Sequence, residues 1–491
     1  MPLIYKGLLI ETSKFAIMIK LSSLFALSLR SLLAICLVQS LVSCANIVPP
    51  SGGPRDSIPP YLLVAKPKDS AINVQPKEIW LAFNEYITTT SLQENVIVAP
   101  SLKNNPLISS KLNVLRIRIS DTLLPNTTYS LQFGNSIKDV NEGNIAENYT
   151  YAFSTGDKLD TGSLEGTIQL AETGLIDSTL LVVLHPAEAD TAIYKNKPLY
   201  YTRLNKNGKF KFRFLPNSTF NIFVLPNDFT KKYDDSTKLF AFADATINST
   251  TQKDAIKLYA FQAYKKTEKK KSTPLVSGKK DTKQTVAALN YNKSLEGLEQ
   301  DLLIPLSLTF ETPIQLNDSF PIKLCDTNNL PVADYKIILD SGTKQKITIE
   351  YPWVEQTKMH LIVPKNSVND SLKNTLAKSD TLRFITKSTS AYGASLIRIT
   401  GYQQFANPIL LLTKDDKILF SYPIVKNLLT IPLLPPNEYT LKILEDRNGN
   451  GIWDTGKYGT QKIQPEIVHV LKNNLLIKPN WENELNLTIN K

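Results

Sequence analysis

Apolar and polar residues alternate over short stretches of this 491-residue chain, most clearly in its first third. In the segment "LRIRI", Leu115, Ile117 and Ile119 fall on one side and two arginines on the other, which predicts a half-buried strand. Turn-forming clusters separate such stretches at intervals typical of β-sandwiches. The pattern predicts five strands here: Glu78–Phe83, Asn95–Pro100, Val114–Ser120, Thr128–Gly134 and Tyr149–Thr155.

The same pattern continues through residues 162–263, where it predicts about seven further strands. Asn207-Gly208 is expected to form a hairpin turn, because glycine adopts the positive φ that such turns require. The following strand alternates basic residues with Phe210, Phe212 and Phe214. We therefore expect these three rings to point into a core.

Two later regions, residues 302–392 and 393–491, repeat this organisation. "LLTIPLLPPNEYTLKILEDRNGNGIWD" in the last region follows the arrangement of "GKFKFRFLPNSTFNIFVLPND" in the second. A lysine-rich linker over residues 264–301 separates the two halves. The chain is therefore predicted to be all-β, with tandem β-sandwiches arranged as two copies of one domain pair.

The N-terminal segment has the pattern of an export signal. Lys14, Lys20 and Arg30 precede an uncharged run over residues 31–43, which is too short to span a bilayer permanently. Residues 1–43 are therefore predicted to be a signal peptide, with Met18 as a second possible start. An alternative is a signal-anchor helix in which Cys44 occurs by chance. Residues 44–56 contain several prolines and two adjacent glycines. They are predicted to form a flexible tether between Cys44 and the first domain.

Several motifs resemble known families. "LVSC", ending at Cys44, resembles a bacterial lipobox, which implies a diacylglycerol anchor on that cysteine in the outer membrane. "IWLAFNEYI", "LLPNTTYSLQFG" and "YAFSTG" make residues 57–156 resemble the SbsA-type bacterial Ig-like domain first described in S-layer proteins. Residues 302–392 resemble it more distantly. Residues 162–263 and 393–491 resemble carboxypeptidase regulatory-like or transthyretin-like β-sandwiches.

The lead-in "CANIVPPSGGPRDSIPP" resembles the N-terminus of Ig-like lipoproteins of the Bacteroidota. Together these resemblances imply β-sandwich domains behind a lipid anchor. They imply no particular activity, because such domains serve many functions.

Net charge changes this interpretation little. The chain carries +11 at neutral pH, but Tyr264–Lys283 alone contains eight lysines against two acidic residues. A polar segment of this kind is expected to be a solvated linker, and nucleic acid is not an expected partner. The alternative is a polybasic arm that contacts anionic headgroups or lipopolysaccharide phosphates.

The sequence contains no recognisable catalytic motif, and we expect no enzymatic activity and no cofactor. Its three histidines, His185, His360 and His469, lie in different predicted domains and lack zinc-ligand spacing. With Cys36 in the signal and Cys44 lipidated, Cys325 has no disulfide partner and is expected to be a buried strand residue.

The stretch "EDRNGNGIWDTG" is the most plausible metal site. Its oxygen-bearing residues follow the spacing of a calcium loop, namely Asp446, Asn448, Asn450 and Asp454. This spacing resembles that of the calcium loops in thrombospondin-type repeats and EF-hands. Lys457 replaces the bidentate glutamate of an EF-hand, so weak calcium binding is the most that we expect. The alternative is a tight hairpin built on Asn-Gly turns, with Trp453 packed beneath it.

Asp-Ser or Asp-Thr followed by Ala, Ile, Leu, Val, Met or Thr recurs along the chain. The triplet resembles the O-glycosylation sequon of exported Bacteroidota proteins, and it is equally typical of ordinary turn chemistry. The candidate acceptors are Ser57, Ser70, Thr122, Ser178, Thr191, Ser236, Ser371 and Thr381.

These observations favour a non-enzymatic outer-membrane lipoprotein, on the periplasmic face or the cell surface. Its sandwiches would brace a partner envelope complex or the cell surface. One alternative is a glycan-binding or adhesion lipoprotein, which would require exposed aromatics such as Tyr200, Tyr201 or Trp481. Another is an accessory subunit of an outer-membrane β-barrel assembly or transport machine. An enzyme with its site between domains is the least favoured alternative.

Overall fold

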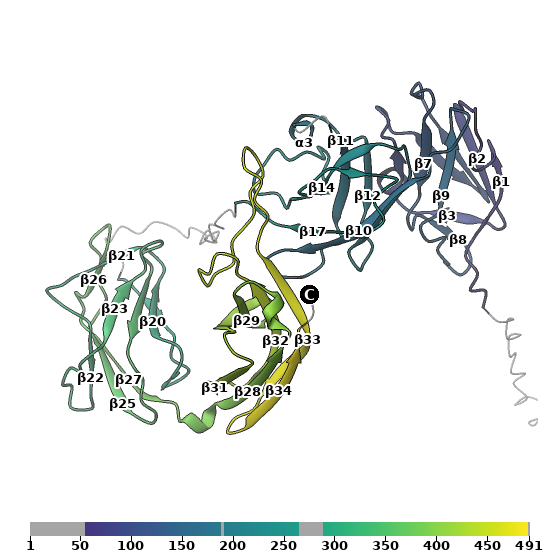
Figure 1. Ribbon diagram of the computed structural model, residues 1–491. Helices are drawn as coiled ribbons and strands as arrows, with labels where there is room; N and C mark the ends of the chain where they lie inside the picture. The colour runs from purple at the N-terminus through teal and green to yellow at the C-terminus, as the bar shows by residue number, and fades with distance from the viewer. Residues whose placement is uncertain (1–54, 188–190, 265–287, 490–491) are drawn as a thin grey trace, which may run out of the picture.

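The computed structural model describes residues 55–187, 191–264 and 288–489. Strands dominate all three segments, which confirms the predicted all-β fold of tandem β-sandwiches. The strands group into four units along the chain, which we call the first to the fourth unit (Figure 1). Among the described residues, no helix is long and apolar enough to cross a membrane.

The first unit contains sheets of order β1-β2-β6-β5, β4-β7-β9 and β3-β8. Ile79, Leu81 and Leu115 are fully buried between the two larger sheets. Outward-facing Arg116 ion-pairs with Glu78, and this hydrogen bond lowers the pKa of the Glu78 carboxyl to about 2. The elements are β1 (Leu62–Lys66), β2 (Glu78–Phe83), β3 (Ile87–Thr89), α2 (Leu92–Asn95), β4 (Ile97–Ala99), β5 (Leu107–Lys111), β6 (Val114–Arg118), β7 (Thr128–Gln132), β8 (Ile137–Asp139) and β9 (Thr150–Ser154).

The second unit packs a sheet of order β13-β10-β17 against one of order β12-β11-β14-β15, in which β16 also pairs with β14. Its elements are β10 (Gly162–Leu170), β11 (Leu180–Pro186), α3 (Ala192–Lys195), β12 (Tyr200–Arg203), β13 (Lys209–Leu215), β14 (Thr219–Pro226), β15 (Ala241–Phe242), β16 (Ile247–Asn248) and β17 (Ile256–Ala260).

One expectation for this unit is wrong. Phe210 and Phe212 are buried as predicted, but Phe214 is only partly buried, at φ 58°. The register between β10 and β13 shifts at this point, so Leu215 takes the inward position instead. A β-bulge adds one residue to a strand and breaks the simple alternation on which the prediction relied. Gly208 has the expected positive φ of 69°, in a turn joining strands of different sheets.

The third unit begins earlier than the sequence indicated. Residues 291–300, assigned to the linker, contain β18 and β19, which pair with β20 and β27. The Tyr291 ring packs 5.6 Å from Phe310, and Leu295 joins the core. The lysine-rich composition obscured these short strands. The unit contains β18 (Tyr291–Lys293), β19 (Glu299–Gln300), β20 (Leu306–Phe310), β21 (Ile314–Leu316), β22 (Lys323–Cys325), β23 (Lys336–Leu339), β24 (Lys346–Glu350), β25 (Lys358–Val363), β26 (Val368–Asp370) and β27 (Asp380–Thr386).

The fourth unit has sheets of order β31-β28-β34 and β30-β29-β32-β33. In both the second and the fourth unit, the central strand of the three-stranded sheet pairs antiparallel with one neighbour and parallel with the other. The second and fourth units therefore share this strand arrangement, as the predicted repeat requires of them. The elements are η1 (Thr389–Ala391), β28 (Gly393–Thr400), η2 (Tyr402–Gln404), β29 (Pro408–Lys414), β30 (Lys417–Pro423), β31 (Leu428–Leu434), β32 (Asn437–Glu445), β33 (Ile467–Ile477) and β34 (Glu482–Thr488).

The bulge in β13 predicts that neighbouring phenylalanines differ in their contribution to stability. Phe212→Ala removes a fully buried ring and should destabilise the second unit by about 3 to 4 kcal/mol. Phe214→Ala removes a partly exposed ring and should cost less than half as much. Calorimetric unfolding of the full chain measures both variants. Equal losses would contradict the inward position assigned to Leu215.

Candidate functional site

The connection between β32 and β33 leaves the fourth unit and packs on the second (Figure 1). We call residues 446–466 the docking loop. Several hydrogen bonds tie the loop and the start of β33 to the second unit, including the three that follow. Thr455 Oγ1 donates to the carbonyl of Gln262 at 2.6 Å, Gln464 Nε2 donates to that of Phe242 at 3.0 Å, and the Val468 amide donates to that of Ala171 at 2.8 Å.

An aromatic cluster forms the centre of this contact. The Tyr458 ring lies 4.9 Å from Phe242, 5.1 Å from Phe240 and 5.5 Å from Phe223. Those three rings are buried residues of the second unit. Trp453 packs against the same cluster and also against the core of the fourth unit. The docking loop therefore completes the core of another unit.

Two glycines allow the second and fourth units to approach closely, and a buried lysine forms hydrogen bonds with both. A Cβ on Gly456 would lie 2.7 Å from the Phe261 ring, and one on Gly174 would lie 2.6 Å from the Val468 carbonyl. Lys442 is only 3% exposed, and its Nζ donates to the Thr173 carbonyl at 2.9 Å. Asp416 lies 3.1 Å from the same Nζ. The buried ammonium is thus satisfied from both units, as buried charges require.

Buried carboxylates hold the docking loop in shape. Asp446 accepts hydrogen bonds from the backbone amides of Gly449 at 2.7 Å and Gly451 at 2.8 Å. Glu466 accepts the amides of Arg447 at 2.7 Å and Asp454 at 3.0 Å. Asp446 and Glu466 are 2% and 4% exposed, and bonds to several amides are a recognised way to satisfy a buried carboxylate.

The predicted calcium ligands lie together in this loop, but their oxygens serve as acceptors within the turn. Both oxygens of Asp446 accept backbone amides, and the side-chain nitrogens of Asn448 and Asn450 each donate to Asp454 Oδ2 at 2.6 Å. The described residues include no group of three or more His, Cys, Asp or Glu arranged for a metal. The candidate ligand oxygens are thus used within the loop's own turns, and calcium binding stays a prediction. The connection spans residues 446–466, so it is not the tight hairpin of the alternative, although Trp453 packs against the core of the fourth unit as that alternative expects.

The predicted lipidation site, Cys44, lies outside the described residues. All eight candidate acceptor residues are described, and seven of them are exposed. Thr381 is partly buried within β27. In several triplets, the aspartate before the acceptor accepts a hydrogen bond from the backbone amide two residues later. Asp56 accepts one from Ile58 at 2.9 Å, and Asp235 accepts one from Thr237 at 2.8 Å. Exposure and turn chemistry are thus both present, and glycosylation stays a prediction.

Other residues from the sequence analysis occupy structural positions. Cys325 is fully buried on β22, as expected, and burial raises the pKa of its thiol. Tyr200 is buried and Tyr201 is half-buried, so these two rings do not form an exposed glycan platform. Trp481 is 58% exposed, with Lys478 Nζ 5.0 Å from its ring. His185 is 2% exposed, and burial lowers its pKa to about 4.

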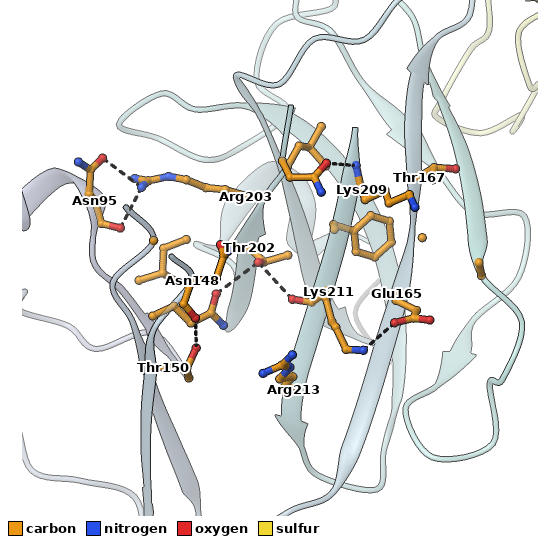
Figure 2. A pocket seen from close by; sticks show the side chains of 18 residues that line it. Asn95, Asn148, Thr150, Glu165, Thr167, Thr202, Arg203, Lys209, Lys211 and Arg213 are labelled. Atoms are coloured by element: carbon orange, nitrogen blue, oxygen red, sulfur yellow. Dashed lines mark hydrogen bonds and ion pairs between the residues drawn. The ribbon is translucent and has the colours of Figure 1, made fainter. Parts of the chain in front are cut away.

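A pocket lies where the first unit meets the second (Figure 2). Its volume is about 510 Å³, within the range of small-molecule sites. We call it the cationic pocket, because four basic residues line it, namely Arg203, Lys209, Lys211 and Arg213. The alternation along β13 indicated that its basic side chains point outward. It could not indicate that residues of the first unit lie opposite them.

Residues 56–155 match the family model described as a bacterial Ig-like domain. The first unit is similar to bacterial Ig-like domains. A search of curated proteins finds no match.

Among solved structures, the Bacillus anthracis TIE protein is 11% identical, with 89% of this chain and 76% of that chain covered and a TM-score of 0.16. The major pilin subunit BcpA of Bacillus cereus is 9% identical, with 67% and 99% covered and a TM-score of 0.16. The MG0-NIE-MG1 segment of Escherichia coli alpha-2-macroglobulin is 12% identical, with 66% and 96% covered and a TM-score of 0.15. Likeness this low carries no argument about function.

Tyr458 should couple the unfolding of the second and fourth units. Tyr458→Ala removes a ring from an aromatic cluster and should weaken the contact by about 3 kcal/mol. We expect calorimetry to show separate transitions for the second and fourth units in this variant and one shared transition for them in the native chain. Lys457→Ala, at an exposed neighbouring position, should change stability by less than about 0.5 kcal/mol. A single unchanged transition in Tyr458→Ala would contradict the coupling.

The buried imidazole of His185 predicts acid sensitivity in the second unit. Its pKa is lowered to about 4 in the folded chain, so only the unfolded chain takes up the proton as the pH falls from about 6.5 to 4. The second unit should lose up to about 3 kcal/mol over this window. His185→Leu should flatten this part of the pH profile of the melting temperature, whereas His360→Gln should preserve it. An unchanged profile in His185→Leu would assign the acid sensitivity to other groups.

Proposed function

We propose that this chain is a non-enzymatic outer-membrane lipoprotein, anchored through Cys44, whose tandem β-sandwiches brace a partner complex of the cell envelope. The observation that carries the proposal is the docking of the fourth unit on the second, through Tyr458 and Lys442. A set of domains with buried contacts between distant units keeps a fixed spacing, which a brace requires and a flexible string of domains lacks.

Further support comes from the N-terminal half. The first unit is similar to bacterial Ig-like domains, a module type suited to structural roles. The lipobox resemblance at Cys44 supplies the anchor, since each buried methylene of an acyl chain contributes about 0.8 kcal/mol and two or three chains bind a membrane stably.

Replacing Cys44 tests the anchor. The Cys44→Ser variant should lose incorporation of labelled palmitate and move from the membrane fraction to the soluble fraction. The change removes only the acylated thiol, so release from the membrane would follow from loss of the acyl chains. Ser51→Thr serves as a matched control, because it lies beyond the lipobox and keeps both the thiol and the four lipobox residues. Membrane retention of Cys44→Ser would contradict lipid anchoring.

The bracing role has its own test. A C-terminally tagged native chain should co-purify with integral outer-membrane proteins after mild cross-linking. Tyr458→Ala should reduce this recovery, because the second and fourth units no longer hold a fixed spacing, whereas Lys457→Ala should retain it. Absence of any membrane-protein partner with the native chain would overturn the bracing role.

A further inference from the structure

The cationic pocket has a marked imbalance of charge. Among the described residues that line it, four are basic and only Glu165 is acidic. Glu165 forms an ion pair with Lys211 at 2.8 Å, as Figure 2 shows. Lys209 and Arg213 have no carboxylate within ion-pair distance among the described residues. Two charges at the pocket are therefore not neutralised by these parts of the protein.

The basic residues come from a predictable strand pattern. On β13, Lys209, Lys211 and Arg213 alternate with buried residues and so share one face. Successive residues on one face of a strand lie about 6.6 Å apart, which places the outer two about 13 Å apart. Basic groups spread over this length suit a ligand that carries more than one anionic group.

The opposite wall is polar and fixed in place. Arg203 of β12 reaches the first unit, where its Nη1 donates to the carbonyl of Asn95 at 2.9 Å and to its Oδ1 at 3.1 Å. Thr202 Oγ1 lies 3.4 Å from Gln132 Oε1 across the same boundary. Figure 2 shows Asn148 and Thr150 on this side of the pocket. Amides and hydroxyls of this kind suit the hydroxyl groups of a saccharide.

Stacking on an aromatic ring cannot hold a ligand here. Phe210 is the only aromatic residue among the described residues that line the pocket, and it is 3% exposed. A neutral saccharide could accept hydrogen bonds from the basic side chains, but it would leave the charges of Lys209 and Arg213 without a counter-charge. A phosphate group supplies that counter-charge as well as acceptor oxygens, so a ligand with phosphate groups is favoured.

We propose that the cationic pocket binds a phosphorylated saccharide, with Lys209 and Arg213 contacting separate phosphate groups and the polar wall contacting hydroxyls. This inference goes beyond the bracing role and does not depend on it. A ligand in this position would contact the first and the second unit at once, since residues of both line the pocket.

Titration calorimetry on the purified full chain tests the proposal. The probe is a bisphosphorylated glucosamine disaccharide, and the matched ligand is the same disaccharide without phosphates. We expect binding of the phosphorylated form only, weakened by added salt because exposed charges are screened. Equal binding of both forms, or binding of neither form, would overturn the proposal.

A double variant locates the binding. Lys209→Gln combined with Arg213→Gln should weaken binding at least about tenfold, since it removes two charge-assisted contacts. Lys346→Gln combined with Lys358→Gln, at exposed positions on strands of the third unit, should change binding less than about twofold. Equal weakening by both pairs would show nonspecific charge attraction and overturn the assignment to this pocket.

A second arm distinguishes a free saccharide from a lipid headgroup as the source of the phosphates. This arm uses the Cys44→Ser chain, with and without the pocket substitutions, so that no acyl anchor contributes to vesicle binding. Phosphatidylcholine vesicles are prepared with and without a glycolipid that carries the same bisphosphorylated disaccharide. Vesicle binding that depends on the glycolipid and is lost in the pocket variant would place a headgroup in the pocket. Vesicle binding that persists in the pocket variant would overturn a role for the pocket at the membrane.

Discussion

Burial of the Tyr458 ring among the phenylalanines of the second unit is the interaction on which the arrangement of the C-terminal three units depends. This contact joins segments that are far apart in the sequence. The hydrogen bond from Lys442 to the Thr173 carbonyl does the same across 269 residues. The third unit lies between the docked units in the chain, so their contact closes a loop that contains it. Closing a long loop has an entropic penalty that grows only slowly with its length, and the buried aromatic contact can offset it.

The repeat explains why the contact forms where it does. In strand order, β14 and β15 of the second unit correspond to β32 and β33 of the fourth. The connection between β14 and β15 contributes Tyr233, whose ring lies 4.0 Å from Phe240, and the corresponding connection in the fourth unit contributes Tyr458, at 5.1 Å from the same ring. Equivalent connections of the two copies thus meet at one aromatic cluster, so the docking resembles a dimer contact within a single chain.

Local patterns predicted the fold well and the contacts between units poorly. Alternation placed Leu115 and Ile117 in a core, and shared motifs revealed the repeat, because both signals are local in sequence. Phe214 was misplaced because a bulge depends on the neighbouring strand. The docking loop was interpreted as a calcium loop or as a hairpin with Trp453 packed beneath it. Tyr458, a second aromatic residue in the same polar, turn-rich stretch, was a signal of burial that this interpretation did not use. The cationic pocket requires residues of two units, which no single stretch reveals.

The second unit holds its neighbours on two sides, and this affects what the cationic pocket can do. At one side it contacts the first unit, where Ala99 joins its core and the Ser101 amide donates to the Leu199 carbonyl at 2.7 Å. At the other side it receives the docking loop. These contacts fix the pocket walls before any ligand arrives, so ligand binding would order few further residues. A small entropic cost of this kind lets a few charged contacts give a useful affinity. A ligand that contacts both walls would in turn favour the same relative position of the first two units, since binding stabilises the arrangement to which it is complementary.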